Sequence, residues 1–326
     1  MAVSDNLIDY IYEPVRDDLV GVESNFHHIA QSNQVQMDGF LTHVLPKPGK
    51  RIRPAITLLS SRFHPNTGEI PILMATSVEL LHIASLIHDD SIDRSSLRHG
   101  VPTISNLWGH NTAILVGDYL FATAAIWACD TGSIRVLRRF SETIQELSVG
   151  ELMESHSAFD LSNTYKHYWE RTYNKTASLF RTAAETGAIL SGIEEKHIQN
   201  LTEYGRNLGM AFQIVDDILD FEGTEDQLGK PVGADLLQGT LTLPAILLME
   251  RYPDDNPVPA LFRSENIEAN SKRAVEMIQN SSIIADSKKF AAKFCDKAVL
   301  SLSNLAETRE RRSLEELASY ILGRKH

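Results

Sequence analysis

The chain has 326 residues, of which 43% are hydrophobic, and its 43 acidic residues outnumber its 31 basic ones. The hydrophobic fraction is typical of a globular protein with a sizeable core, and the net charge of −12 excludes a general nucleic-acid-binding surface. Two cysteines, Cys129 and Cys295, give neither a disulfide framework nor a close metal spacing. This favours a reducing, cytoplasmic location.

The hydrophobic pattern predicts helices nearly throughout and few strands, so the expected fold class is all-α. Glycine and proline mark breaks at residues 46–49, 98–102 and 223–244. No linker divides the chain, so we expect one domain over residues 1–326. Ser313 and Glu316 have the spacing of a capping box, which predicts a helix start there. No signal peptide is evident, and no stretch reaches the about 18 apolar residues of a membrane-spanning helix.

Basic residues gather at the first break. Lys50, Arg51 and Arg53 stand at a predicted helix start, where free backbone N–H groups and the helix dipole favour an anion. A diphosphate would suit this position, although an ordinary solvated basic loop has the same composition.

The first distinctive motif is Asp-Asp-x-x-Asp at residues 89–93, after apolar residues with helical spacing. On a helix, Asp89 and Asp93 share a face and present two carboxylates side by side. Repulsion between them is relieved if a cation sits there, and oxygen ligands without nearby cysteine favour Mg²⁺. His82 lies two helical turns earlier on nearly the same face, so it is a candidate for the same cavity.

A second Asp-Asp-x-x-Asp motif occupies residues 216–220, again after a helical apolar pattern. Asp216 and Asp220 form its pair, and Gln213 shares the face of Asp216. Both motifs lie at the C-terminal end of a predicted helix, where the helix dipole disfavours anions. This repeated local conflict points to function. Three further cations, Arg98, Lys175 and Lys230, predict a site that holds Mg²⁺ and phosphate oxygens together.

These blocks resemble those of the trans-isoprenyl diphosphate synthases. The run from Glu79 to Asp93 is similar to the first aspartate-rich motif of that family. Other blocks follow in the family order over roughly residues 40 to 250: Gly49 to Pro54, Gly117 to Ala122, Gly150-Glu151, Lys175-Thr176, Gln213 to Asp220, Gly229-Lys230-Pro231 and Thr242-Leu243-Pro244. Several ordered blocks are far more specific than one motif.

The resemblance implies a helical bundle around a central cavity, assembled as a homodimer, in which the two acidic clusters face each other. It implies that three Mg²⁺ ions, held by Asp89, Asp93, Asp216 and Asp220, grip the diphosphate of an allylic substrate. Arg98, Lys175 and Lys230 would stabilise the leaving diphosphate. Isopentenyl diphosphate would bind near Lys50, Arg53, His82, Arg98 and His99, and Thr176 and Gln213 would line the allylic pocket.

Two positions depart from the family pattern. Arg98 is followed by His99, where paired arginines are common, and Gly239 is followed by Thr240, where many members have lysine. Small residues, Ala84 and Ser85, stand one turn before Asp89, where short-chain members carry bulky aromatic residues. The resemblance therefore predicts a product longer than C20. Such a product would seek membranes, so peripheral membrane contact for its release is expected.

Other interpretations stay open. A geranylgeranyl- or farnesyl-range short-chain synthase differs only in product length. A weakly active regulatory subunit of a heteromeric prenyltransferase would fit His99 and Thr240, but not the intact carboxylates. A class I terpene cyclase shares the metal chemistry, although its second motif normally mixes other residues with acids. A plain helical scaffold explains the composition but not the ordered cations.

Overall fold

The computed structural model describes residues 2–31, 37–45, 49–64, 68–98, 100–223 and 231–324. Over these residues the protein is helical apart from one short hairpin, which confirms the all-α prediction. The chain forms two compact units. Unit 1 comprises Met1–Gln145, Leu179–Gly205 and Val299–Leu317, and unit 2 comprises Glu146–Ser178, Arg206–Ala298 and Ala318–His326. The single domain over the whole chain stays a prediction, and each unit is described by itself.

Unit 1 contains the N-terminal helices and the first parts of three helices that continue into unit 2. Its complete elements are α1 (Ala2–Ile11), η1 (Glu13–Val15), α2 (Arg16–Ala30), α3 (Asp38–Val44), α4 (Ile52–Ser61), α5 (Glu69–Ile92), β1 (Leu97–Arg98), β2 (Val101–Pro102), α6 (Ile104–Trp108), α7 (His110–Asp130) and η3 (Leu302–Asn304). The shared helices are α8 (Ile134–His156), α11 (Glu195–Glu222) and α18 (Arg309–Leu322), and nearly all of α10 (Ser178–Ser191) also belongs to unit 1.

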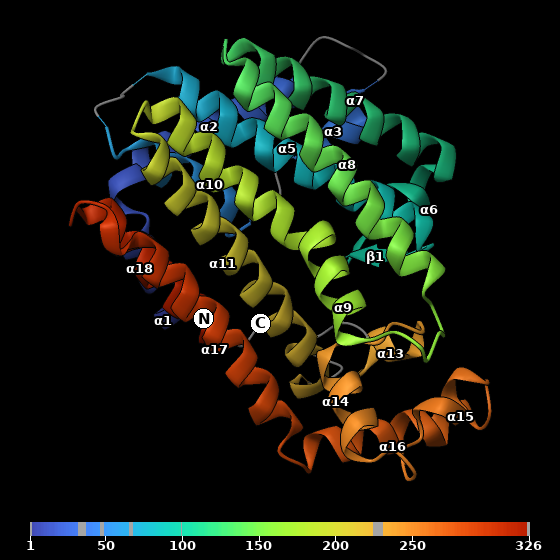
Figure 1. Ribbon diagram of the computed structural model, residues 1–326. Coiled ribbons are helices and arrows are strands. Elements are labelled where there is room, and N and C mark those ends of the chain that lie inside the picture. Colours follow the sequence, from blue (N-terminus) through green and yellow to red (C-terminus); the bar gives the residue numbers. More distant parts are fainter. Residues whose placement is uncertain are drawn as a thin grey trace. The chain divides into compact units, whose positions relative to one another are not determined.

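The centre of unit 1 is α5, which lies beside α7 (Figure 1). Leu80, Leu81 and Ala84 are fully buried, as the helical spacing of apolar residues predicts. The two helices approach closely at Gly117 of α7. A Cβ atom there would lie 2.1 Å from Nε2 of His88, so only glycine permits this contact. The packing therefore fixes the residue that immediately precedes the first aspartate motif.

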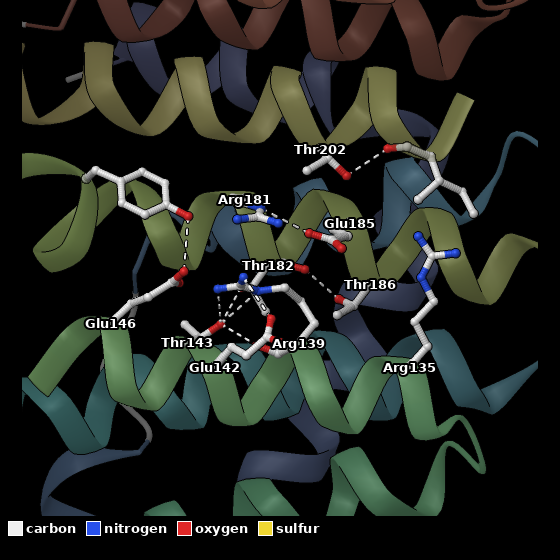
Figure 2. Close-up of polar contacts among 12 residues, drawn as sticks. Arg135, Arg139, Glu142, Thr143, Glu146, Arg181, Thr182, Glu185, Thr186 and Thr202 are labelled. Atoms are coloured by element: carbon white, nitrogen blue, oxygen red, sulfur yellow. Dashed lines mark hydrogen bonds and ion pairs between the residues drawn. The ribbon is translucent and has the colours of Figure 1, made fainter. Parts of the chain in front are cut away.

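A polar seam joins α8 and α10 within unit 1 (Figure 2). Arg139 is 3% exposed, and its Nε donates to Thr182 at 3.0 Å while its Nη2 donates to Thr143 at 3.1 Å. A buried guanidinium is tolerated because hydroxyl oxygens accept hydrogen bonds from its N–H groups. Arg135 bonds Glu195 on the neighbouring α11 through two N–H groups.

The predicted break at residues 98–102 is a tight antiparallel hairpin, in which Leu97 pairs with Pro102 and Arg98 with Val101. Gly100 has φ +76°, the left-handed conformation that glycine adopts without strain. Thr103 then caps α6, because its side chain accepts from the N–H of Asn106 at 3.1 Å. The sequence indicated the break but not the pairing, since strands of two residues carry no alternating pattern.

Unit 2 contains the second halves of α8 and α11 and the helices between residues 165 and 298. Its remaining elements are α9 (Tyr165–Thr172), η2 (Tyr173–Ala177), α13 (Ala234–Leu237), α14 (Leu243–Arg251), α15 (Val258–Phe262), α16 (Ile267–Gln279) and α17 (Ile283–Ser301). α17 belongs to this unit up to Ala298. Element η2 is a π-helical turn, a rare conformation that is frequent at functional sites.

Two sequence predictions were wrong. By length and composition alone, α5 and α7 could each cross a membrane, although an acid, Glu79 in α5 and Asp118 in α7, lies within each apolar stretch. Most of the tested stretch of α5 is buried in the protein, as in core helices of soluble proteins, so this is weak evidence for a span.

The capping box at Ser313 is also absent. α18 begins at Arg309 after Thr308, whose hydroxyl accepts from the N–H of Arg311, and Ser313 is buried inside the helix.

Candidate functional site

The first aspartate motif closes α5, as predicted. The N–H of Asp93 donates to the carbonyl of Asp89 at 2.8 Å, so the two residues stand one helical turn apart on one face. Asp89 is partly exposed and Asp93 is exposed, while Asp90 between them is 7% exposed. The outer carboxylates are therefore open to solvent and the middle one faces the protein.

Asp90 is held by Arg98 of the hairpin. The Nε of Arg98 lies 2.9 Å from both carboxylate oxygens of Asp90, and Nη2 lies 2.8 Å from one of them. Such a fork fixes both groups, because a guanidinium and a carboxylate match in plane and spacing. Arg98 thus lies directly beside the first motif, as the sequence indicated, but it binds an aspartate of that motif within the protein.

His82 lies on α5 among three arginines. Burial lowers the pKa of His82 well below its ordinary value of 6.5, and the nearby charges of Arg53, Arg98 and Arg51 lower it further. The imidazole is therefore neutral at physiological pH, with one nitrogen able to donate and one able to accept. The charges of Arg53 and Arg98 therefore act on His82, and a binding site shared by these residues stays a prediction.

The basic segment before α4 divides into two kinds of residue. Arg51 has φ +48° and turns inward, where Nε lies 2.6 Å from Glu23 and Nη1 lies 3.2 Å from Glu79. Lys50 is exposed, and the guanidinium of Arg53 lies 4.7 Å from the ring centre of Phe180. The helix start at Ile52 confirms the prediction. Of the three cations, Arg51 is committed to internal carboxylates.

The two small residues before Asp89 have different surroundings. Ala84 is fully buried, whereas Ser85 is partly exposed and its hydroxyl donates to the carbonyl of His82 at 2.8 Å. A larger side chain at Ala84 would have to displace packed neighbours.

The second aspartate motif lies in the last turns of α11. Asp216 is partly exposed, and its carboxylate lies 3.0 Å from Nη1 of Arg324, near the C-terminus. The guanidinium of Arg324 also covers the ring of Phe212 at 4.3 Å. Asp220 is 3% exposed, and one of its oxygens accepts from the backbone N–H of Asp235 at the start of α13. Of the outer carboxylates, Asp216 therefore faces a cation, and Asp220 faces the start of a helix.

The middle residue of this motif, Asp217, is 2% exposed and enclosed by hydrogen bonds. The Tyr168 hydroxyl donates to one oxygen at 2.5 Å, and the Gln213 amide donates to the other at 2.9 Å. Thr176 in turn donates to the Gln213 carbonyl at 2.5 Å. Burial raises the pKa of Asp217 to about 7, although the bonds from Tyr168 and Gln213 act to lower it. The predicted pair Thr176 and Gln213 is thus in direct contact.

Lys175 belongs to the π-helical turn η2 and is held by two acids of α8. Its Nζ lies 3.0 Å from Glu151 and 2.5 Å from Glu154. The turn touches α8 at Gly150, where a Cβ atom would lie 2.6 Å from the backbone nitrogen of Lys175. The Gly150-Glu151 block of α8 and the Lys175-Thr176 block of η2 are therefore in direct contact.

Two predicted residues, His99 and Lys230, lie outside the described residues. Over the described part of the chain, no three histidine, cysteine, aspartate or glutamate side chains gather as a ready metal cage. A hollow of about 520 Å³ in unit 2 lies elsewhere, lined by Tyr165, Trp169 and neighbours on α14 and α17, and none of the motif aspartates lines it.

Comparisons with known proteins define the class. Residues 34–278 match the model of the family described as polyprenyl synthetase. The chain is 36% identical to heptaprenyl diphosphate synthase component 2 of Geobacillus stearothermophilus, over 95% of this chain and 97% of that protein. It is 34% identical to chloroplastic solanesyl-diphosphate synthase 2 of Oryza sativa subsp. japonica, over 97% of this chain and 80% of that protein. The polyprenyl synthase of Caulobacter crescentus CB15, crystallised with calcium and isoprenyl diphosphate, is 32% identical with a TM-score of 0.91, covering 98% of each chain.

The chain belongs to the polyprenyl synthetase family and has the isoprenoid synthase fold. It is a prenyltransferase, more particularly a polyprenyl diphosphate synthase. The family depends on a divalent metal and uses isopentenyl and allylic diphosphates.

Sequence reasoning missed the residues that hold the predicted ones. Tyr168, Arg324 and the pair Glu151 and Glu154 are far in sequence from their partners Asp217, Asp216 and Lys175. A tyrosine or an acid on a helix has no local pattern that marks such a partner. Only the Gly150-Glu151 block carried a signal, because it resembles one of the ordered blocks of the family.

Proposed function

We propose that this protein condenses isopentenyl diphosphate with an allylic diphosphate and makes a polyprenyl diphosphate longer than C20. One observation carries the proposal: each Asp-Asp-x-x-Asp motif ends a long helix, and its middle aspartate is bonded inside the protein. Asp89, Asp93, Asp216 and Asp220 are then the metal ligands. Their donors are carboxylate oxygens, which fit Mg²⁺.

Few protein ligands are expected for Mg²⁺, because substrate phosphates and water complete its octahedron. When bound, Mg²⁺, of which we propose three ions per site, would supply positive charge to the departing diphosphate. Lys175, Arg98 and Lys230 add positive charge around that group. Lys175 and Arg98 already face carboxylates. A bound diphosphate would therefore either replace these carboxylates or share the two cations with them.

The second substrate, isopentenyl diphosphate, is assigned to Lys50, Arg53, His82, Arg98 and His99. A neutral His82 near Arg53 and Arg98 supports this assignment, because positive charge attracts an anion and the neutral imidazole can donate a hydrogen bond to it. Thr176 and Gln213 line the allylic pocket, where hydroxyl and amide dipoles stabilise a cation without attacking it. The released diphosphate takes the proton that ends each extension.

We assign the length of the product to the small side chains of Ala84 and Ser85, which stand where short-chain family members carry bulky aromatic residues. Support comes from relatives named as heptaprenyl and solanesyl diphosphate synthases at about one-third identity. Such a product seeks lipid, so we propose peripheral membrane contact for its release. A cytoplasmic location stays a prediction, because the rice relative is chloroplastic.

We further propose a homodimer. Its support is a set of large apolar side chains that are exposed along α6 and α7 in unit 1: Leu107, Trp108, Ile114 and Leu115, between 40% and 67% exposed. Exposed apolar clusters of this kind mark protein interfaces. A second copy of the chain is the occupant assigned to this surface.

The direct experiment incubates the purified protein with Mg²⁺, labelled isopentenyl diphosphate and, separately, dimethylallyl, geranyl, farnesyl and geranylgeranyl diphosphate. Products longer than C20 are expected. Products of C20 or shorter would identify a short-chain synthase.

A second candidate, a subunit of a two-component enzyme, is favoured by the relative named as a component 2. Absence of elongation with every starter would favour that function for the isolated chain.

A further inference from the structure

A chain of hydrogen bonds runs through the interior of unit 2 from α9 to η2. It begins at the Tyr168 hydroxyl, which donates to Oδ2 of Asp217 at 2.5 Å. Gln213 Nε2 donates to the other oxygen of Asp217 at 2.9 Å, and the Thr176 hydroxyl donates to Gln213 Oε1 at 2.5 Å. The chain therefore couples a residue with no assigned role to two residues of the allylic pocket.

The direction of each bond follows from chemistry. Each oxygen of Asp217 accepts one bond, so the nitrogen of the Gln213 amide faces Asp217 and its oxygen faces Thr176. The only proton of the Thr176 hydroxyl is then directed to Gln213, which leaves the lone pairs of that hydroxyl as acceptors. Reversal of the amide would place the Gln213 carbonyl oxygen against a carboxylate oxygen of Asp217, where both atoms are acceptors, so Asp217 sets the polarity of the pocket.

Tyr168 holds Asp217 from the opposite side of Gln213. Its side chain is 2% exposed, and its ring packs edge-on against Trp169 with 4.8 Å between centroids. The guanidinium of Arg171 lies 5.8 Å from the same ring and donates to the Leu241 carbonyl at 2.9 Å. The ring is therefore held by packing that does not involve its hydroxyl. The role of the hydroxyl can be tested separately.

Tyr168 and Thr176 lie close together in the sequence, in the consecutive elements α9 and η2. Tyr168 lies in α9 immediately before η2, and Thr176 lies near the end of η2. Both are bonded to the same face of α11, where Gln213 and Asp217 are one turn apart. The rare π-helical turn that carries Lys175 is thus tied to α11 on both sides.

We propose that Tyr168 is a positioning residue for prenyl transfer, acting through Asp217 and Gln213 to orient the Thr176 hydroxyl toward the allylic substrate. This inference rests on the proposed function and adds a residue outside the known blocks of the chain. Tyr168 touches neither substrate nor metal in this role. Its effect is carried by three side chains whose contacts are all inside unit 2.

The test uses Tyr168→Phe, which removes only the hydroxyl. Tyr165→Phe is the matched control, because Tyr165 lies on the same helix and its hydroxyl bonds Glu250 at 2.6 Å, away from this chain. We expect Tyr168→Phe to lower kcat about tenfold, the order expected for a hydrogen bond to a charged group. The KM for isopentenyl diphosphate should stay unchanged, and Tyr165→Phe should behave as the wild type.

A double-mutant cycle gives a readout that general destabilisation would not produce. Thr176→Val should also lose rate, Thr176→Ser should restore it, and Tyr168→Phe combined with Thr176→Val should cost little more than Thr176→Val alone. Binding of a thio analogue of farnesyl diphosphate, followed by calorimetry, reports on positioning without turnover. Multiplying losses, or equal behaviour of the two tyrosine variants, would overturn the inference. Lack of elongation by the wild-type protein would instead defeat the proposed function.

Discussion

Gly150 is the position where a single methyl group should report most clearly on the site. In the Gly150→Ala variant the new Cβ would lie 2.6 Å from the backbone nitrogen of Lys175 and 2.9 Å from the carbonyl carbon of Asn174. Both atoms belong to the backbone of η2, so no side-chain rotation can relieve the overlap. Either α8 or the π-helical turn must move.

The magnitude follows from two opposing contributions. Overpacking of this kind costs about 1–3 kcal/mol, while replacing glycine in a helix returns roughly 0.5–1 kcal/mol. A net loss of about 1–2 kcal/mol in the free energy of unfolding is expected. Because η2 carries Lys175 and Thr176, displacement by even part of an ångström should also lower the elongation rate, by about tenfold or more.

Thermal unfolding and steady-state elongation measure the two effects, and two other glycines calibrate them. Gly39→Ala, where a Cβ atom meets nothing within 4 Å, should be neutral or slightly stabilising. Gly117→Ala meets the His88 ring, which is a side chain, so it should disturb the first motif less directly. If Gly150→Ala unfolds at or above the wild-type temperature with full activity, the backbone contact does not hold η2.

Further predictions concern the rest of the site. His82 stays neutral when folded but protonates near its ordinary pKa of 6.5 when unfolded, so the unfolded chain binds more protons and stability should fall as pH drops below about 6.5. His82→Gln should flatten that decline in denaturant titrations, and an unchanged pH profile would contradict it. Ala84→Phe should shorten the product while turnover remains measurable, and unchanged chain length would remove Ala84 as the determinant. Arg324→Gln removes the cation 3.0 Å from Asp216, so calorimetry should show tighter Mg²⁺ binding; weaker binding would mean that Arg324 does not compete with the metal.

The elements that sequence predicts best here are the long helices with dense apolar patterns. Both aspartate motifs lie at the ends of such helices, as the spacing of apolar residues predicted, because burial of one face decides a helix regardless of distant partners. Thr176 and Gln213, which the family resemblance assigned to one pocket, are in direct contact, and the pocket itself stays a prediction.

What sequence could not give is the partner of each buried polar group. Asp90 and Asp217 look like further ligands in the motif, yet Arg98 and Tyr168 occupy them. Such choices depend on which helices meet, and a side chain far along the chain leaves no local trace of its contact. The hairpin after Asp93 was invisible for the opposite reason, since its strands are too short to carry a period.

The central claim is that the outer aspartates of both motifs bind the metal that activates the allylic diphosphate. The most direct measurement is the elongation rate as a function of Mg²⁺ concentration for Asp89→Asn and Asp216→Asn. Each variant should lose about a hundredfold or more in rate, the order seen when one transition-state-stabilising group is removed, and each should require more Mg²⁺. A wild-type rate and Mg²⁺ dependence in either variant would contradict the account.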